Sequence, residues 1–256
     1  MGHGPRPRVR SPRVRALAGL LGGLALLFGG CGDTPRTIES TVRYEPPLEH
    51  RIVVETVVDL PFDAAWDELI RRLSESSFRV AALEKASRFV LVEVHRSSDL
   101  AAKANRPSRF VDCGRTTRTF AEGAETERFE YAVADSSAHR ESDPMDGGYR
   151  VSEVERRVDL DARATLYLQP EGERRTRVTV KARYELAIEV AGRATFVAAD
   201  VEEASAEAVA FGPRTESIRF TTFQPGSDQR SGGLTCRATG VLEHALIALA
   251  NPAAAI

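Results

Sequence analysis

The side chains of this chain that are best suited to chemistry are those of its three cysteines. They lie far apart, at positions 31, 113 and 236. A thiol can act as a nucleophile, carry a lipid, bind a metal or join a second thiol in a disulfide. Which of these occurs depends on the compartment and on the neighbouring groups. The segment around Cys31 decides the compartment, and with it the chemistry of the other two cysteines.

The segment before Cys31 has the pattern of a secretory signal. Five arginines and no acidic residue precede an apolar run of 13 residues, from Ala16 to Phe28. A helix needs about 20 residues to cross a bilayer core, so this run is too short to span one. A basic start, a short apolar run and small residues before a cut site are typical of a signal peptide. We therefore expect residues 1–30 to be removed.

Gly29, Gly30 and Cys31 resemble the lipobox of bacterial lipoproteins, with Phe28 where that family usually has Leu. The resemblance implies cleavage before Cys31 and a thioether-linked diacylglycerol on its sulfur. Two or three acyl chains, at about 0.8 kcal/mol per buried methylene, would anchor the chain stably. Gly32 follows Cys31 where inner-membrane lipoproteins of enteric bacteria carry Asp, which favours the periplasmic face of the outer membrane. The alternatives are a soluble secreted protein cut near Gly30 and a retained signal anchor.

If Cys31 carries lipid, Cys113 and Cys236 remain as an even pair in an oxidising compartment, which favours a disulfide. Such a bond would close a loop of more than 100 residues. In the chain-entropy description, a loop of that length is worth about 4 to 5 kcal/mol of stability. Two free thiols or a metal pair are the alternatives.

Catalysis has little support in the sequence. Cys113 could serve as a nucleophile beside Asp112, with a base from His95, His139 or His244. No protease signature surrounds it, however, and no His or Cys pair has the close spacing of a zinc site. A Gly-rich phosphate loop and a serine nucleophile elbow are also absent from the sequence. We therefore expect a noncatalytic role, with no cofactor and no metal.

The charge of the mature chain argues against nucleic acid as a partner. Loss of residues 1–30 removes five of the 35 basic residues and none of the 37 acidic ones, which leaves a formal charge of −7. Nucleic-acid binding depends on clustered Lys and Arg, and here the arginines are scattered through strand-like segments.

The pattern of prolines and apolar residues predicts a flexible tether over 31–49 and one folded domain over 50–256. The tether has three prolines and little apolar periodicity, and it could also be an arm that binds a partner. The folded part is expected to begin with a strand at 52–60, followed by a helix at 64–75 capped by Asp63. Trp66 lies on the apolar stripe of this helix, so we expect it to pack in the core, with ligand stacking as the alternative.

Further elements follow from the same patterns. Runs at 78–83 and 89–95 predict a hairpin, and alternation at 157–168 and 178–190 predicts a long one, with a charged face that is either solvated or partner-binding. Between them, residues 96–145 are expected to form long loops with one or two short strands. The remaining chain is read as a helix or loop at 196–211, a strand at 216–223 and a helix at 241–249.

The order of these features resembles outer-membrane lipoproteins of the BamC (NlpB/DapX) type. The resemblance covers the anchor, the tether and residues 52–96, and it rests on Pro61-Phe62-Asp63-Ala64-Ala65-Trp66 and on Phe78-Arg79-Val80. It implies a helix-grip fold, in which an antiparallel sheet curls around a helix. It also implies an accessory role in the machinery that inserts β-barrel proteins into the outer membrane.

Taken together, these patterns predict an α+β domain with about six or seven antiparallel strands and two helices packed on them. The expected function is noncatalytic support of outer-membrane protein assembly, through contacts with the membrane and with envelope proteins. The rival expectation is a module that binds an apolar ligand or a lipid in a cavity between helix and sheet.

Overall fold

Two strands of 24 residues each, β9 (Gly148–Glu171) and β10 (Arg175–Ala198), form the hairpin around which the other elements are arranged. They pair without a break from Glu171 and Arg175 at the turn to Gly148 and Ala198 at the far end. The computed structural model describes residues 37–97, 106–200, 207–228 and 233–251. In the half near the turn, apolar side chains at every second position make one face of this hairpin the core face.

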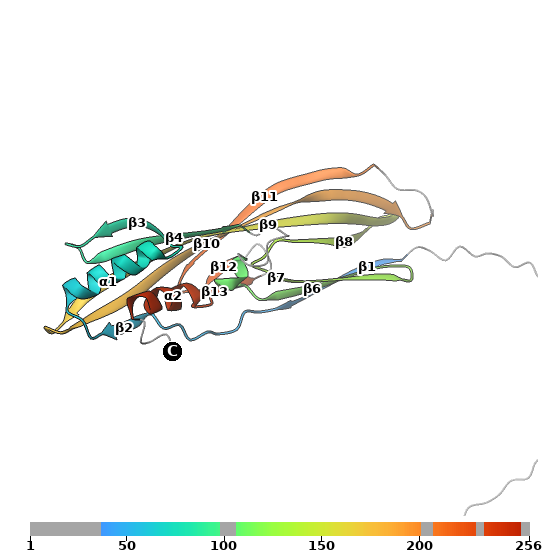
Figure 1. Ribbon diagram of the computed structural model, residues 1–256. Helices are drawn as coiled ribbons and strands as arrows, with labels where there is room; N and C mark the ends of the chain where they lie inside the picture. Colours follow the sequence, from blue (N-terminus) through green and yellow to red (C-terminus); the bar gives the residue numbers. More distant parts are fainter. Residues whose placement is uncertain (1–36, 98–105, 201–206, 229–232, 252–256) are drawn as a thin grey trace, which may run out of the picture. The chain divides into compact units, whose positions relative to one another are not determined.

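Five further strands extend the hairpin into a seven-stranded antiparallel sheet (Figure 1). Along β9, the half near the turn pairs with β4 (Phe89–Ser97) and the far half with β8 (Ser137–Met145). Along β10, the corresponding partners are β2 (Glu55–Val58) and β11 (Val209–Thr221). β3 (Arg79–Glu84) completes the sheet by pairing with β4. The two halves of the long hairpin therefore have different neighbours.

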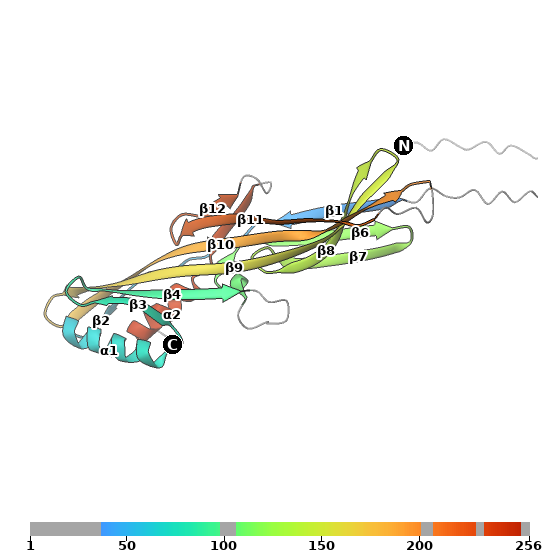
Figure 2. The same ribbon diagram turned by 90° about the horizontal axis from the view of Figure 1, so that it is seen from above.

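Two smaller sheets complete the β structure. One consists of β1 (Ile38–Glu45), β6 (Arg115–Glu122) and β7 (Glu125–Ala132), and the other of β5 (Val111–Asp112), β12 (Gly226–Asp228) and β13 (Leu234–Ala238). A short 3-10 helix, η2 (Pro107–Arg109), precedes β5. In Figure 2, β6 and β7 lie beside β8, in agreement with the contacts between β6 and β8.

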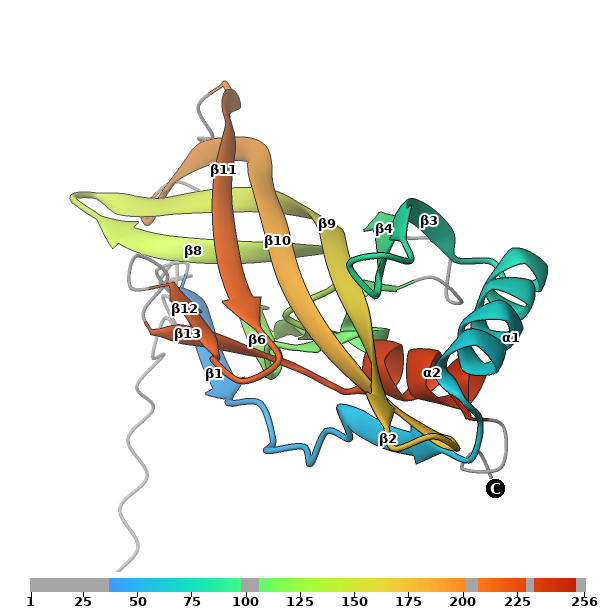
Figure 3. The same ribbon diagram turned by 90° about the vertical axis from the view of Figure 1, so that its left-hand side faces the viewer.

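Two helices, α1 (Phe62–Glu75) and α2 (Val241–Ala250), cover the half of the hairpin near its turn (Figure 3). Trp66, Leu69 and Leu73 recur at helical spacing on α1, so one stripe of the helix is apolar. These side chains are buried in one cluster with the inward residues of β4, β9 and β10. Side chains thus fill the space beneath Trp66, whose ring also lies 6.0 Å from that of Phe62. Within the described residues, no helix is long and apolar enough to span a membrane.

A buried carboxylate ties α2 to the hairpin. Oε1 of Glu243, in the first turn of α2, accepts hydrogen bonds from the Tyr184 hydroxyl at 2.8 Å and the Thr222 hydroxyl at 2.7 Å. Burial, followed by the charge of Glu243, raises the pKa of Tyr184. The hydroxyl therefore remains a donor to the carboxylate.

The disulfide between Cys113 and Cys236 is present, as predicted, with sulfur atoms 1.97 Å apart. It joins the end of β5 to β13, and both cysteines are buried. Gly114 follows with φ of +78°, and a Cβ there would lie 2.1 Å from the carbonyl oxygen of Glu45. This position requires glycine because β1 passes so close to it.

The predicted α+β class, the antiparallel pairing and the two helices are confirmed. The expected count of six or seven strands is wrong, because the structure has 13 strands in several sheets. The helix at 64–75, the helix at 241–249 and both hairpins are present, although Asp63 does not cap α1, which starts at Phe62 without a side-chain cap.

The structure differs most from the expectation in two segments. The segment 31–49, expected as a tether, contains β1, which pairs with β6 over its whole length. Residues 96–145, expected as long loops with one or two short strands, contain four strands, β5 to β8. The segment 196–211 contains the end of β10 and the start of β11, and Cys31 lies outside the described residues.

Candidate functional site

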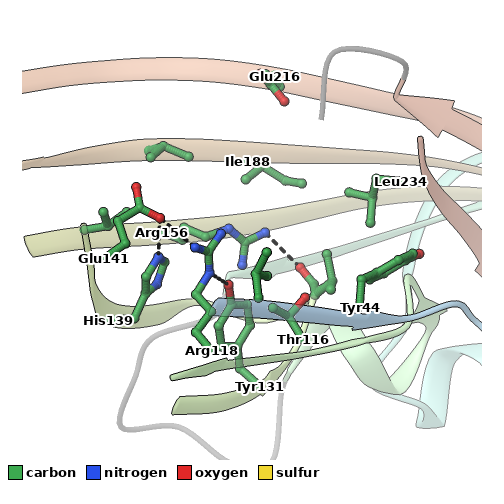
Figure 4. Close-up of a pocket in the computed structure, with 14 residues that line it drawn as sticks. Tyr44, Thr116, Arg118, Tyr131, His139, Glu141, Arg156, Ile188, Glu216 and Leu234 are labelled. Carbon is green, nitrogen blue, oxygen red and sulfur yellow. Dashed lines mark hydrogen bonds and ion pairs between the residues drawn. The ribbon is translucent and has the colours of Figure 1, made fainter. Parts of the chain in front are cut away.

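A cleft of about 450 Å³ opens where the sheet β1-β6-β7 faces the far half of the long hairpin. Each of these strands contributes side chains to it, as do β8, β11 and β13. Aliphatic residues form one part of its lining, and these are Val42, Val133, Val154, Ile188, Val190 and Leu234. Polar residues form the other part, and these are Tyr44, Thr116, Arg118, Tyr131, His139, Glu141, Arg156 and Glu216 (Figure 4).

The cleft continues the core face of the hairpin beyond the helices. Side chains two residues apart on a strand share a face, so Arg156 and Val154 of β9 lie on the same face as Val158 and Leu160. Val158 and Leu160 belong to the core cluster, whereas Val154 and Arg156 line the cleft. Where α1 and α2 no longer cover this face, a polar wall supplied by β6, β7 and β8 replaces them.

An ion-pair cluster forms this polar wall. Nη1 of Arg118 lies 2.6 Å from Oε2 of Glu141, and its Nε donates to the Tyr131 hydroxyl at 3.1 Å. His139 and Arg118 lower the pKa of Glu141, which outweighs the opposite effect of burial. The cluster joins three strands and therefore fixes the orientation of its side chains.

His139 is the most buried polar side chain of this cluster, with 1% of it exposed. Its Nε2 lies 3.6 Å from Oε2 of Glu141, which is longer than a direct hydrogen bond. Neither ring nitrogen has a hydrogen-bond partner among the described residues. The ring stacks on Tyr131 with centroids 5.8 Å apart. Buried polar groups are normally satisfied, and the imidazole of His139 is held here by the Glu141 carboxylate and the Tyr131 ring.

Arg156 reaches the cleft from β9 and is held by neutral groups. Its Nη2 donates to the carbonyl of Val133 at 3.0 Å, and its Nη1 donates to the carbonyl of Asp135 at 3.2 Å and to the Ser137 hydroxyl at 3.5 Å. Burial lowers the pKa of Arg156, although neighbouring Tyr131 and acidic side chains offset part of this effect. Its guanidinium also lies 5.4 Å from the centre of the Tyr131 ring.

This arrangement is suited to binding. A few fixed polar groups beside an aliphatic wall can orient a small ligand, as in most small-molecule sites. The cleft lining contains no serine or cysteine nucleophile. No cluster of His, Cys, Asp and Glu that could hold a metal occurs within the described ranges.

The residues singled out from the sequence lie in different places. Cys113 is oxidised in the disulfide and cannot act as a nucleophile in this state, which contradicts the alternative of a Cys113 nucleophile with a histidine base. His95 is exposed and pairs with Asp161, and His244 accepts a hydrogen bond from the backbone of Val53. Trp66 is 4% exposed and packs in the core, away from the cleft.

The sequence interpretation missed Arg118, Glu141 and Arg156. One signal was available for Arg156, because it falls in phase with the inward residues of β9 that begin at Val158. A charged residue at an inward position is unusual unless it is paired or functional. Arg118 and Glu141 have no comparable signal in the sequence, since the segment that contains them lacks the alternation of apolar and polar residues that would predict β6 and β8.

A comparison of the chain with known protein families, curated proteins and solved structures finds no match, so its function has to be argued from the geometry of this cleft.

Proposed function

We propose that this protein is a lipid-anchored protein of the bacterial cell envelope that binds an apolar ligand noncatalytically. The cleft carries the proposal. Its volume of about 450 Å³ falls within the range of about 300 to 1,000 Å³ that is usual for small-molecule sites. The aliphatic residues would hold the ligand and the fixed charged groups would orient it. The cavity expected from the sequence lay between helix and sheet beneath Trp66, whereas this cleft lies between two sheets and is lined by no helix residue.

The proposed location is the periplasmic face of the outer membrane, with Cys31 as the lipidated residue. Support for this location comes from the lipobox resemblance and from the disulfide, which is typical of oxidising compartments. We expect Cys31→Ser to release the protein from membranes into soluble fractions, because a single uncleaved apolar run of 13 residues anchors poorly. Fractionation of cell envelopes with an antibody against the chain measures this. Unchanged membrane association of the variant would contradict lipid anchoring.

A second candidate function is an accessory role in the assembly of outer-membrane β-barrel proteins. The packing beneath Trp66 favours it, because α1 is joined to the hairpin through one cluster of buried apolar side chains, which suits a rigid scaffold. The resemblance of residues 52–96 to BamC-type lipoproteins supports the same role. This second proposal includes a helix-grip fold, in which the antiparallel sheet curls around α1.

A larger side chain at the mouth of the cleft should distinguish ligand binding from the accessory role. Val42 lines the cleft and is 60% exposed, so Val42→Trp should narrow the entrance without disturbing the core. Val80→Trp on β3 is the matched control, because Val80 is 39% exposed and does not line the cleft. We expect a small molecule to co-purify from solubilised envelopes with the wild type and Val80→Trp, but not with Val42→Trp.

The measurement is mass spectrometry of the extracted ligands and of the co-purified proteins. Identical small-molecule profiles for all three proteins would contradict ligand binding in the cleft. Barrel-assembly components recovered equally with all three would then favour the scaffold. Their absence from every sample would contradict the accessory role.

A further inference from the structure

Arg156 is the one cleft arginine without an ion pair among the described residues. Arg118, the other arginine of the cleft, is neutralised by Glu141 at 2.6 Å. The acceptors of Arg156 are two backbone carbonyls and one hydroxyl, none of which carries a charge. A guanidinium removed from water in this way gains most from an anion that completes its set of partners.

The geometry of these hydrogen bonds leaves part of the guanidinium available. A guanidinium has five N–H donors. In Arg156, Nη1 makes two of the three hydrogen bonds and Nη2 makes the third. Nε–H has no acceptor in the described part of the chain, and Nη2 has one acceptor there for its two hydrogens. These two donors lie on one edge of the planar group, and such an edge matches the two oxygens of a carboxylate or phosphate.

The other charged groups of the cleft limit the charge of the ligand. Glu141 and Glu216 line the same cleft, and Glu216 acts electrostatically on Arg156. A dianionic phosphate would therefore bring two negative charges to a single guanidinium that Glu216 already compensates in part. A monoanionic carboxylate needs only that one partner, so the charge distribution favours it over phosphate.

The aliphatic part of the lining defines the rest of the ligand. Val154 lies two residues from Arg156 on the same strand, and Ile188 and Val190 lie on the neighbouring strand β10. A hydrocarbon group attached to a carboxylate at Arg156 would lie against these side chains and lose contact with water.

We propose that the cleft binds a small apolar monocarboxylate, with its carboxylate on the Nε–Nη2 edge of Arg156 and its hydrocarbon part against the aliphatic wall. This inference rests on the proposed ligand-binding function and specifies its ligand class. The His139 ring lines the same cleft, and its nitrogens make no direct hydrogen bond within the described residues, so it offers a further hydrogen-bonding group near the polar end.

The test uses the full lipidated protein in nanodiscs of zwitterionic lipid, with a photoreactive octanoate as the probe. Octanoate and octanol are compared as competitors, because they share the hydrocarbon chain and differ in charge. We expect the probe to label cleft peptides and octanoate to compete at least about ten times better than octanol. Such a difference corresponds to one charge-assisted pair.

Arg156→Lys keeps the charge and removes the planar edge, so it should weaken octanoate competition about tenfold or more. Arg183→Lys on the exposed face of β10 is the control and should have no effect, because Arg183 does not line the cleft. Arg156 also holds the carbonyls of the β7–β8 connection, so circular dichroism must show that the variant is folded. The comparison of octanoate with octanol on the wild type needs no variant and decides the question by itself.

Equal competition by octanol and octanoate would overturn the carboxylate proposal, and so would the absence of cleft labelling. Either result leaves the ligand-binding function intact if Val42→Trp still loses its co-purified molecule. If Val42→Trp keeps its co-purified molecule, the proposed ligand-binding function is itself contradicted.

Discussion

Replacing both cysteines of the disulfide, in the variant Cys113→Ala with Cys236→Ala, should lower the free energy of unfolding by about 4 to 5 kcal/mol. The bond joins residues that are 123 positions apart, so it removes a large loop-closure entropy from the unfolded chain. It also ties β5 to β13, two strands that share only two paired positions. Urea unfolding of the wild type and the double variant, followed by circular dichroism, measures the difference.

Reduction provides a matched control for this prediction. A reducing agent should lower the wild-type unfolding midpoint to that of the double variant and leave the variant unchanged. Cys31→Ala alone should unfold like the wild type, because Cys31 takes no part in the bond. A wild-type midpoint that does not respond to reduction would refute the stabilising role of the disulfide.

Trp66→Ala is expected to lower the free energy of unfolding by about 3 to 5 kcal/mol, the usual cost of truncating a large buried aromatic side chain. Trp66 is 4% exposed and belongs to the cluster that α1 forms with β9 and β10, so its removal leaves a cavity in the main core. Because Trp66 does not line the cleft, octanoate competition by the folded variant should match the wild type. Thermal or urea unfolding and the competition assay give the two values.

Leu83→Ala on β3 is a suitable control, since Leu83 is 50% exposed and its truncation should change stability by about 0.5 kcal/mol or less. If Trp66→Ala unfolded like the wild type but bound octanoate more weakly, Trp66 would be a ligand residue and the packing assignment would be wrong.

The elements that the sequence predicts well are those that bury an apolar face. The stripe of α1 and the alternation in β9 and β10 follow from packing against one hydrophobic core, so their periods are visible in the sequence. The predicted ends were less accurate. β9 begins ten residues before Val158, because its far half faces the cleft and its inward positions no longer have to be apolar.

The same cause explains why the sequence pattern does not predict the strands of the polar wall. The inward positions of β6 include Thr116 and Arg118, and those of β8 include Ser137 and His139. A strand whose inward side chains are polar lacks the alternation of apolar and polar residues that identifies strands. The polar wall of the cleft was therefore not predicted for the same physical reason as the far half of β9.

The pairing of β1 could not be read from the sequence either. Its partner β6 lies about 80 residues away, with Ile38 opposite Glu122, and no local turn connects the two. Val42 and Tyr44 are exposed on this strand, so composition alone resembles that of a linker. Only the non-local pairing shows that it belongs to a sheet.

The position of β1 also limits how far the cleft can be from the bilayer. Ile38 is seven residues after Cys31, and an extended chain advances at most about 3.6 Å per residue, so the strand begins within about 25 Å of the sulfur. Val42 and Tyr44, the cleft residues of this strand, follow Cys31 by 11 and 13 residues. Lipidation of Cys31, as proposed, would therefore keep this wall of the cleft within about 50 Å of the lipidated sulfur.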